Sequence, residues 1–221
     1  MSELPESNDP IRTAALLEGQ EEERKRLSRE LHDGIGQLLT GIRWHIDQLA
    51  DAPFTERQRD SYQELQQLIL ETIAATRQVS FDLMPSVLSD FGLDAALRLL
   101  CERTTRPGTL TVDFQSNKRS ERLSEATEIH LYRITQEALT NALKYANASR
   151  MEVRLTETSL HQLVLRIVDD GIGFSLEELT RRAQVRSGLR NMKLRAELLG
   201  GRFQIESVPG QGTIIEVSLS Q

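Results

Sequence analysis

The chain has 221 residues and a formal net charge of −6 at pH 7, and its residues are 38% hydrophobic and 5% aromatic. This length and composition are typical of a soluble globular protein with one large or two small domains. The acidic balance and the scarcity of aromatic side chains argue against general nucleic-acid binding by phosphate neutralisation or base stacking.

The single cysteine, Cys101, excludes an internal disulfide and leaves a cysteine-based zinc site without enough ligands. The sequence has no run of about 18 apolar residues, and its start, MSELPESNDP, lacks the basic and apolar regions of a signal peptide. We therefore expect a reducing, cytoplasmic setting and no membrane segment in this chain.

The first part, residues 15–85, has the pattern of two long helices after a flexible tail at residues 1–14. Apolar residues recur at helical spacing in both segments, and the break lies in ADAPFTER, around Pro53. One antiparallel hairpin would leave an apolar stripe on each helix uncovered, so we expect a homodimeric four-helix bundle across a two-fold axis. The stripes comprise Leu27, Leu31, Leu38, Ile42 and Leu49 in the first helix and Tyr62, Leu65, Ile69, Ile73, Thr76, Val79 and Leu83 in the second.

The second part, residues 90–221, alternates helices with strands. A short helical stretch, GLDAALRLLCERTTR, precedes the expected strand LTVDFQS and the strong helix SEATEIHLYRITQEALTNALKYA. Four further strands are expected at MEVRLTET, HQLVLRIVDD, RFQIESV and TIIEVSLS, with a last helix, GLRNMKLRAELLGG, before the third of these. Helices interleaved with largely hairpin-connected strands predict a two-layer α+β sandwich.

The segment ELHDGIGQ, inside the first long helix, contains the first candidate site. His32 lies about 90° from the centre of the apolar stripe, where solvent can reach its ring. The neighbouring Asp33 can hold the imidazole in the tautomer that leaves one nitrogen nucleophilic, and can accept the released proton. Gln37, four residues beyond Asp33, could position a water. The alternative is a solvated histidine, although the two helix-destabilising glycines in this segment favour a function.

The segment EALTN, on the strong helix, contains the second candidate site. Glu137 and Asn141 offer hard oxygen ligands one turn apart, which suit magnesium bound with phosphates. Lys144 adds a positive charge for a phosphate oxygen, and Arg133 lies on the same face by spacing. An ordinary polar helix face is the alternative.

The third candidate, VDDGIGF, follows an apolar strand. Asp169 or Asp170 could accept a hydrogen bond from an exocyclic amine, while Gly171 and Gly173 leave room for a flat ligand against the backbone. Equally, a DxGxG loop is a common turn.

Two later glycine segments extend this site. Gly188 in SGLRNM is expected to open a helix whose free N–H groups face a phosphate, and PGQGT is a glycine-rich turn before the last strand. The intervening SLEELTRRAQVRS could fold over a ligand, with three arginines that reach a phosphate or are simply solvated: Arg181, Arg182 and Arg186.

The order of these segments resembles the sensor histidine kinases of two-component systems, in the subfamily with an ELHD-type phosphorylation motif whose usual partners are LuxR-type response regulators. The resemblance covers about Glu21 to Leu219 and rests on EEERKRLSRELHDGIGQLL, ITQEALTNALKYANAS, VDDGIGF, GLRNMKLRAELLGG and VPGQGTIIEVSL. It implies a dimerisation and phosphotransfer hairpin at residues 15–85, followed at residues 90–221 by an ATP-binding sandwich of the type found in gyrase.

The resemblance also implies roles for individual residues. His32 matches the phosphorylated histidine, Asp33 its acidic neighbour, and Asp33 with Gln37 a DxxxQ pattern associated with dephosphorylating the partner. The Mg²⁺ ligands would be Asn141 and Glu137, and Asp169 would read the adenine amine of ATP. The remaining matches to the nucleotide pocket are Lys144, Gly171, Gly173, Gly188, Gly210, Gly212 and Thr213.

Two positions depart from the family pattern, Tyr145, where a histidine is frequent, and Asp170, where an asparagine is frequent. No sensor domain is recognisable, so the chain is expected to be a cytoplasmic fragment or a kinase controlled by a separate protein. The alternative function is an ATP-binding dimeric scaffold or regulatory ATPase without phosphotransfer. His32 discriminates between the two, because ATP binding alone needs no nucleophile on the hairpin.

Overall fold

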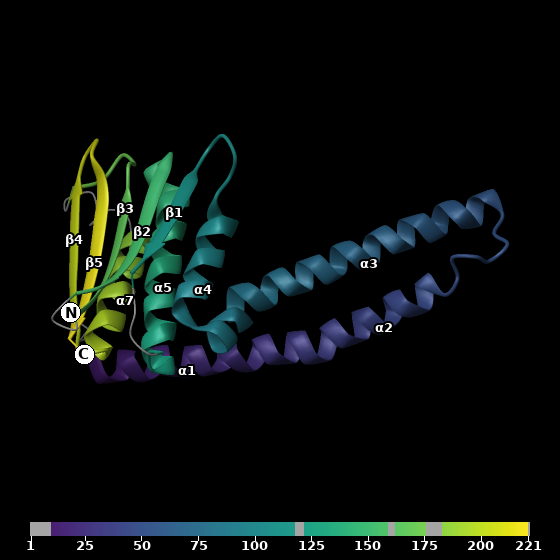
Figure 1. The fold of residues 1–221 in the computed structure, drawn as a ribbon, viewed down its shortest axis with the longest axis horizontal. Helices are drawn as coiled ribbons and strands as arrows, with labels where there is room; N and C mark the ends of the chain where they lie inside the picture. Colours follow the sequence, from purple (N-terminus) through teal and green to yellow (C-terminus); the bar gives the residue numbers. More distant parts are fainter. Residues whose placement is uncertain (1–9, 118–121, 159–161, 176–182, 221) are drawn as a thin grey trace, which may run out of the picture. The chain divides into compact units, whose positions relative to one another are not determined.

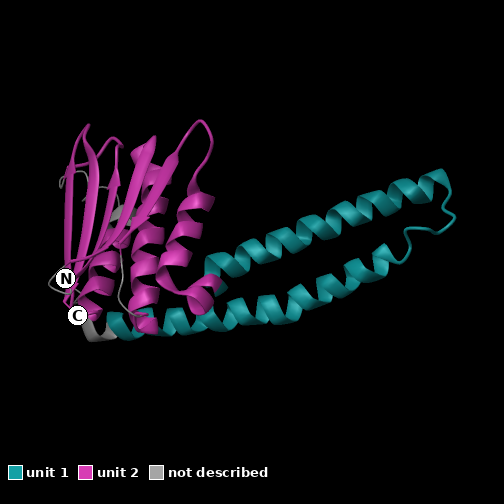
Figure 2. Cartoon of the chain, viewed as in Figure 1, with its two compact units in different colours: residues 1–86 teal, residues 87–221 magenta. Residues whose placement is uncertain are grey.

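The computed structural model describes residues 10–117, 122–158, 162–175 and 183–220. The chain divides into two compact units, Met1–Ser86 and Val87–Gln221 (Figure 2). The first unit is a helical hairpin and the second is an α+β domain, as the sequence predicts.

The first unit is an antiparallel pair of helical rods (Figure 1). The first rod runs through α1 (Pro10–Arg29), a π-helical segment η1 (Glu30–Ile35) and α2 (Gly36–Asp47). The second rod is α3 (Glu56–Leu83), which begins with a capping box between Thr55 and Gln58. Since α1 begins at Pro10, residues 10–14, expected to belong to a tail, are helical.

The hairpin has few buried apolar side chains between its rods, notably Ile46 and Ile69. Many large apolar side chains are instead exposed, as expected for a hairpin that needs a partner surface. Between η1 and the end of α3 the exposed ones are Ile35, Leu38, Ile42, Trp44, Leu49, Leu65, Leu68, Leu70 and Val79. Among the helices of the described residues, none has the length and apolar character needed to cross a membrane.

The second unit is a five-stranded sheet with helices on one face (Figure 1). Its strands are β1 (Thr111–Ser116), β2 (Arg150–Glu157), β3 (Gln162–Asp169), β4 (Arg202–Val208) and β5 (Gly212–Ser220). The order is β1-β2-β3-β5-β4, and only the pair β1 and β2 is parallel. All five predicted strands are confirmed.

Among the described residues, the helices of this unit are α4 (Ser86–Thr104), α5 (Glu125–Asn141) with the π-helical extension η2 (Ala142–Ala146), and α7 (Ala183–Leu198). α5 and α7 pack on each other, and apolar residues that alternate along β2 and β3 line the sheet side of the core. This is the expected two-layer sandwich. Gly92, with φ of 81°, interrupts α4, and the buried Glu128 carboxylate faces that kink.

Candidate functional site

A pocket opens in the second unit between the end of α5, the end of β3 and the start of β5. Its polar lining residues are Asn141, Tyr145, Asp169 and Thr213, and its remaining walls are largely apolar, including Met151. An apolar pocket with a few converging polar groups is typical of a small-molecule site.

The structure distinguishes between the two candidate aspartates. Asp169 lines the pocket, and its carboxylate accepts a hydrogen bond of 2.9 Å from the Gly171 N–H. Burial raises the pKa of Asp169, and hydrogen bonds from Gly171 and Thr213 only partly offset this effect.

Asp170 does not line this pocket. Its carboxylate accepts hydrogen bonds from Ser149 N at 2.8 Å, Ser149 Oγ at 2.6 Å and Arg150 N at 2.9 Å. Burial works against ionisation of Asp170, but these hydrogen bonds outweigh it and leave its pKa below the ordinary value. Asp170 therefore ties the loop to the start of β2, and Asp169 is the carboxylate that can receive a ligand amine.

The pocket glycines are required by close backbone approaches. A Cβ on Gly173, where φ is 60°, would lie 2.1 Å from the Val208 carbonyl oxygen. A Cβ on Gly212, where φ is 81°, would lie 2.0 Å from the Asp169 carbonyl oxygen, and one on Gly171 would lie 2.5 Å from a backbone oxygen of η2. These glycines therefore let the backbone segments of the pocket wall approach each other. Gly173 also lines the pocket, and the expected room for a flat ligand there stays a prediction.

Glu137 and Asn141 are brought together, as the sequence predicts, and Gly188 lies directly against them. A Cβ on Gly188 would lie 2.1 Å from Glu137 Oε1 and 3.4 Å from Asn141 Nδ2. The Asn141 Nδ2 group is buried and has no hydrogen-bond partner in the described part of the chain. A buried donor without a partner is costly, so it points to a bound group that satisfies it.

One expectation for these segments is wrong: Gly188 does not open a helix, because α7 already begins at Ala183 and no helix breaker separates the two positions. Arg133 precedes Glu137 by four residues on α5, so the two share a face as expected, and Arg133 is buried and donates to Gln136 Oε1 at 2.7 Å. Lys144 is exposed on η2 and is not among the residues that line the pocket, and its contact with a phosphate stays a prediction.

Part of the expected covering segment cannot be placed. Arg181 and Arg182 lie outside the described residues, and so does the side chain of Arg186.

His32 lies in η1, so the helix changes from α to π at the predicted phosphorylation motif. Its side chain is 72% exposed, and Nδ1 lies 3.0 Å from Asp33 Oδ1. A carboxylate accepts hydrogen bonds, so this contact favours a proton on Nδ1. In the neutral ring that tautomer leaves the Nε2 lone pair free, which is the arrangement that the sequence predicts.

A cavity of about 340 Å³ lies beside this ring in the groove between the two rods. His32 and Gln37 line it from the first rod and Arg77 lines it from α3, whereas Asp33 does not. The π segment, with its wider turn, explains why Gln37 shares this surface with His32 rather than with Asp33. None of the exposed large apolar side chains of the hairpin lines the cavity.

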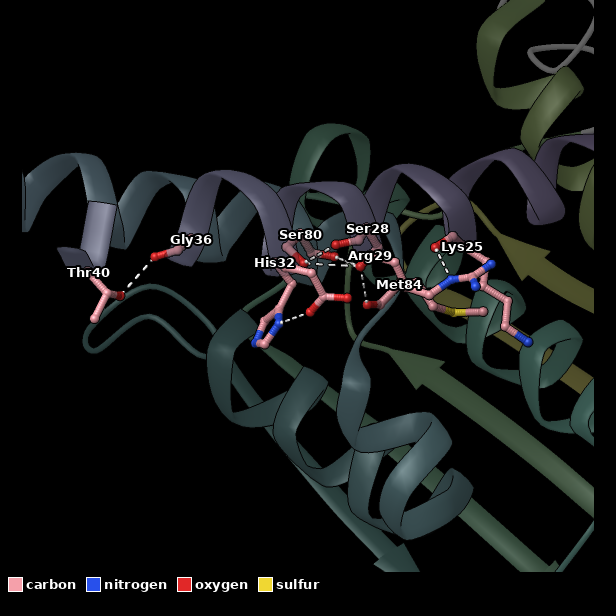
Figure 3. Close-up of polar contacts among 9 residues, drawn as sticks. Lys25, Ser28, Arg29, His32, Gly36, Thr40, Ser80 and Met84 are labelled. Atoms are coloured by element: carbon pink, nitrogen blue, oxygen red, sulfur yellow. Dashed lines mark hydrogen bonds and ion pairs between the residues drawn. The ribbon is translucent and has the colours of Figure 1, made fainter. Parts of the chain in front are cut away.

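Two features of this site were missed by sequence reasoning. Arg77 follows the stripe residue Ile73 by four positions, which was the available signal for its place in the groove. Ser28 and Ser80 form a buried hydrogen-bonded contact between the rods, close to His32 (Figure 3). Their only signal is that small polar residues occupy positions at helical spacing from the apolar stripes.

Comparison with known families agrees with this geometry. Residues 23–88 match the family model described as "Histidine kinase", and residues 126–221 match "Histidine kinase-, DNA gyrase B-, and HSP90-like ATPase". The chain belongs to the histidine kinase family. A curated relative, the oxygen sensor histidine kinase NreB of Staphylococcus carnosus (strain TM300), is 34% identical over 203 residues, which are 92% of this chain. The chain spans 58% of the length of that relative.

Two solved structures share the fold of this histidine kinase. One is the histidine kinase domain of the blue-light activated histidine kinase from Erythrobacter litoralis EL346, with a TM-score of 0.50 and 19% identity. That match covers 90% of this chain and 94% of the other. A second structure titled with the same kinase has a TM-score of 0.51 and 19% identity, covering 76% of this chain and 63% of the other.

Proposed function

We propose that this chain phosphorylates His32 from Mg²⁺-bound ATP and transfers the phosphoryl group to an aspartate of a response regulator. The observation that carries the proposal is the exposed imidazole whose Nδ1 is held by Asp33, in a chain that also holds a pocket with a half-buried carboxylate, Asp169. Neither feature alone requires phosphotransfer, but an accessible nucleophile and a nucleotide pocket together supply both of its reactants.

The pocket residues fit a nucleotide. Asp169 would accept a hydrogen bond from the adenine amine, and the unpartnered Asn141 Nδ2 would donate to a phosphate oxygen of the bound nucleotide. No cluster of three or more acidic, histidine or cysteine ligands occurs among the residues described, so Glu137 and Asn141 would hold Mg²⁺ together with phosphate oxygens. The ion would neutralise phosphate charge.

The residues around His32 fit the transfer step. Nε2 would attack the γ-phosphorus, so that an N–P bond forms while the bond from phosphorus to the ADP oxygen breaks. The imidazole would then carry an excess positive charge, and Asp33, bound to Nδ1 at 3.0 Å, would take up that proton. Arg77 lines the same groove as His32 and would offer a cation to the new phosphoryl group.

The exposed apolar residues of the hairpin support a homodimer through α2 and α3. None of these exposed residues lines the groove that contains His32, and the 72% exposed ring would be the point of access for the receiver domain of the regulator. A LuxR-type regulator is the partner class that the phosphorylation motif favours. ATP as substrate and the buried free thiol of Cys101 fit a cytoplasmic location.

Gln37 would add a phosphatase activity toward the phosphorylated regulator. Its amide lines the groove beside His32, and an amide can orient a water without exchanging a proton at neutral pH.

The test is labelling with γ-³²P ATP and Mg²⁺, with acid and base treatment of the product. We expect an acid-labile, base-stable phosphate that disappears in His32→Gln and persists in His45→Gln, a matched control because His45 is also exposed on the first rod. An acid-stable phosphate, or normal labelling of His32→Gln, would contradict the assignment. ATP hydrolysis without any labelled histidine would favour the regulatory ATPase instead.

A further inference from the structure

Two buried serines form hydrogen bonds between the two rods, one helical turn before His32. Ser28 in α1 is 7% exposed and Ser80 in α3 is 9% exposed. The Ser28 hydroxyl lies 3.0 Å from each of three oxygens: Ser80 O, Ser80 Oγ and Met84 O. The Ser80 hydroxyl lies 3.2 Å from Ser28 O, so each serine can donate its single proton to the opposite rod (Figure 3).

The position of these bonds in the chain is informative. Ser28 precedes His32 by four residues, and its carbonyl lies just before the π segment Glu30–Ile35. Met84 ends α3, adopts an extended conformation and precedes Pro85, so its carbonyl has left the helical hydrogen-bonding pattern. The serines therefore join the turn before His32 to the last turn of α3, where the chain leaves the hairpin.

Hydroxyls buried between helices specify one relative rotation of those helices. Rotation or sliding of the first rod would leave both hydroxyls without partners inside the interface, which is unfavourable. Regular α-helical hydrogen bonding through residues 30–35 would remove the π turn and rotate the two ends of the rod by about 100° relative to each other, the angle of one residue. The structure has the π form, because the Gly36 N–H donates to Leu31 O and this hydrogen bond closes the π segment.

We propose that Ser28 and Ser80 are positioning residues that hold the π segment and thereby fix the direction in which His32 faces. The proposal deepens the proposed function and rests on His32 as the phosphate acceptor. In the observed setting the ring is 72% exposed, Nδ1 is held by Asp33, and the ring shares its groove with Gln37 and Arg77. Loss of the serine contact would populate other rotations, in which this arrangement is absent.

The test uses phosphoramidate, which phosphorylates histidine without ATP and so reports on His32 separately from the nucleotide pocket. A buried hydrogen bond biases an equilibrium about fivefold, which is the upper limit of the resulting loss of the observed setting, so we expect Ser28→Ala and Ser80→Ala each to slow phosphorylation of His32 by up to about fivefold. The double variant should be no slower than either single variant, because the two hydroxyls act as a unit. Ser28→Thr, which keeps a hydroxyl, should recover part of the rate.

Ser61→Ala is the matched control, because the Ser61 hydroxyl is exposed on α3 and bonds only its own helix, at Arg57 O. A second control measures general loosening of the hairpin. It uses the rate at which His45 is carbethoxylated in the same samples, with mass spectrometry as the detection method. The proposal predicts that His45 reacts at the parent rate while His32 slows.

Parent-like rates in Ser28→Ala and Ser80→Ala would overturn the proposal, and so would a parallel change of His32 and His45. If phosphoramidate does not label His32 in the parent, the proposal also fails. If it labels His32 but Mg²⁺-ATP does not, the proposed kinase function fails, while the comparison of serine variants still decides the positioning role.

Discussion

Replacement of Gly188 by alanine should separate stability from activity. Gly188 lies inside α7, where alanine is favoured over glycine by about 1 kcal/mol. The added Cβ would lie 3.4 Å from Asn141 Nδ2, an ordinary contact, but 2.1 Å from Glu137 Oε1. The Glu137 carboxylate must therefore retreat by more than about 1 Å to restore van der Waals separation. Because this carboxylate ends a flexible side chain, its displacement need not unfold the domain.

A displacement of about 1 Å in a catalytic constellation can lower a rate about a hundredfold. We therefore expect the initial rate of His32 labelling from Mg²⁺-ATP to fall by that order in Gly188→Ala, while thermal unfolding followed by circular dichroism stays at or above the parent temperature. Gly19→Ala is the control, because Gly19 is helical and nothing lies within 4 Å of its would-be Cβ. Full labelling by a stable Gly188→Ala variant would refute a role for Glu137 where the structure places it.

Three further changes test other parts of the molecule. Asn141→Ala should abolish Mg²⁺-dependent ATP use without lowering the unfolding temperature, since its buried Nδ2 has no hydrogen-bond partner in the described chain. ATP titration calorimetry checks this, and unchanged binding and labelling would contradict it. Gln37→Ala should leave His32 labelling largely intact while it slows dephosphorylation of a purified phospho-regulator, and the reverse pattern would refute the water-orienting role. Burial, with a smaller contribution from Glu102, raises the pKa of Cys101 to about 12. A thiol reagent at neutral pH should therefore modify the chain only after it is unfolded in urea, and rapid modification of the folded chain would contradict this.

The periodicity of apolar residues and the positions of turn residues were sufficient to predict the architecture. The apolar stripes predicted the hairpin, and alternation between turn residues predicted all five strands, because both patterns are properties of consecutive residues. The spacing of Glu137 and Asn141 placed both on one face for the same reason. Exposure of His32 also followed from its position beside the stripe, although the helix there is π rather than α.

Contacts between distant residues could not be predicted in this way. Asp169 and Asp170 are adjacent and chemically identical, and only the pairing of Asp170 with Ser149 decides which one lines the pocket. Arg77 reaches the groove of His32 from the opposite rod, 45 residues later in the chain. α7 begins at Ala183 and not at Gly188, where the sequence predicted its start. The helix propensity of residues 183–187 outweighed the tendency of glycine to mark a helix boundary.

The last prediction concerns Asp169, where folding and ligand binding make opposite demands. Burial raises the pKa of this carboxyl above its value in an unfolded chain. A group shifted in this direction contributes stability that is fully present below the unfolded pKa and is lost as pH rises through the folded pKa. Ionised Asp169 therefore destabilises the ligand-free domain at neutral pH, whereas asparagine at this position keeps an oxygen for the Gly171 N–H and carries no charge.

Asp169→Asn should accordingly be more stable than the parent in urea unfolding at about pH 7.5, and this advantage should shrink as the pH is lowered through the raised pKa of the parent carboxyl. ATP affinity, measured by calorimetry in the same buffers, should fall in the variant, because the amide is a weaker acceptor for the adenine amine than a carboxylate. A stability difference independent of pH would refute the burial argument. Unchanged ATP affinity would instead assign recognition of adenine to another pocket residue, and the structure offers the Thr213 hydroxyl as the nearest alternative on the same wall.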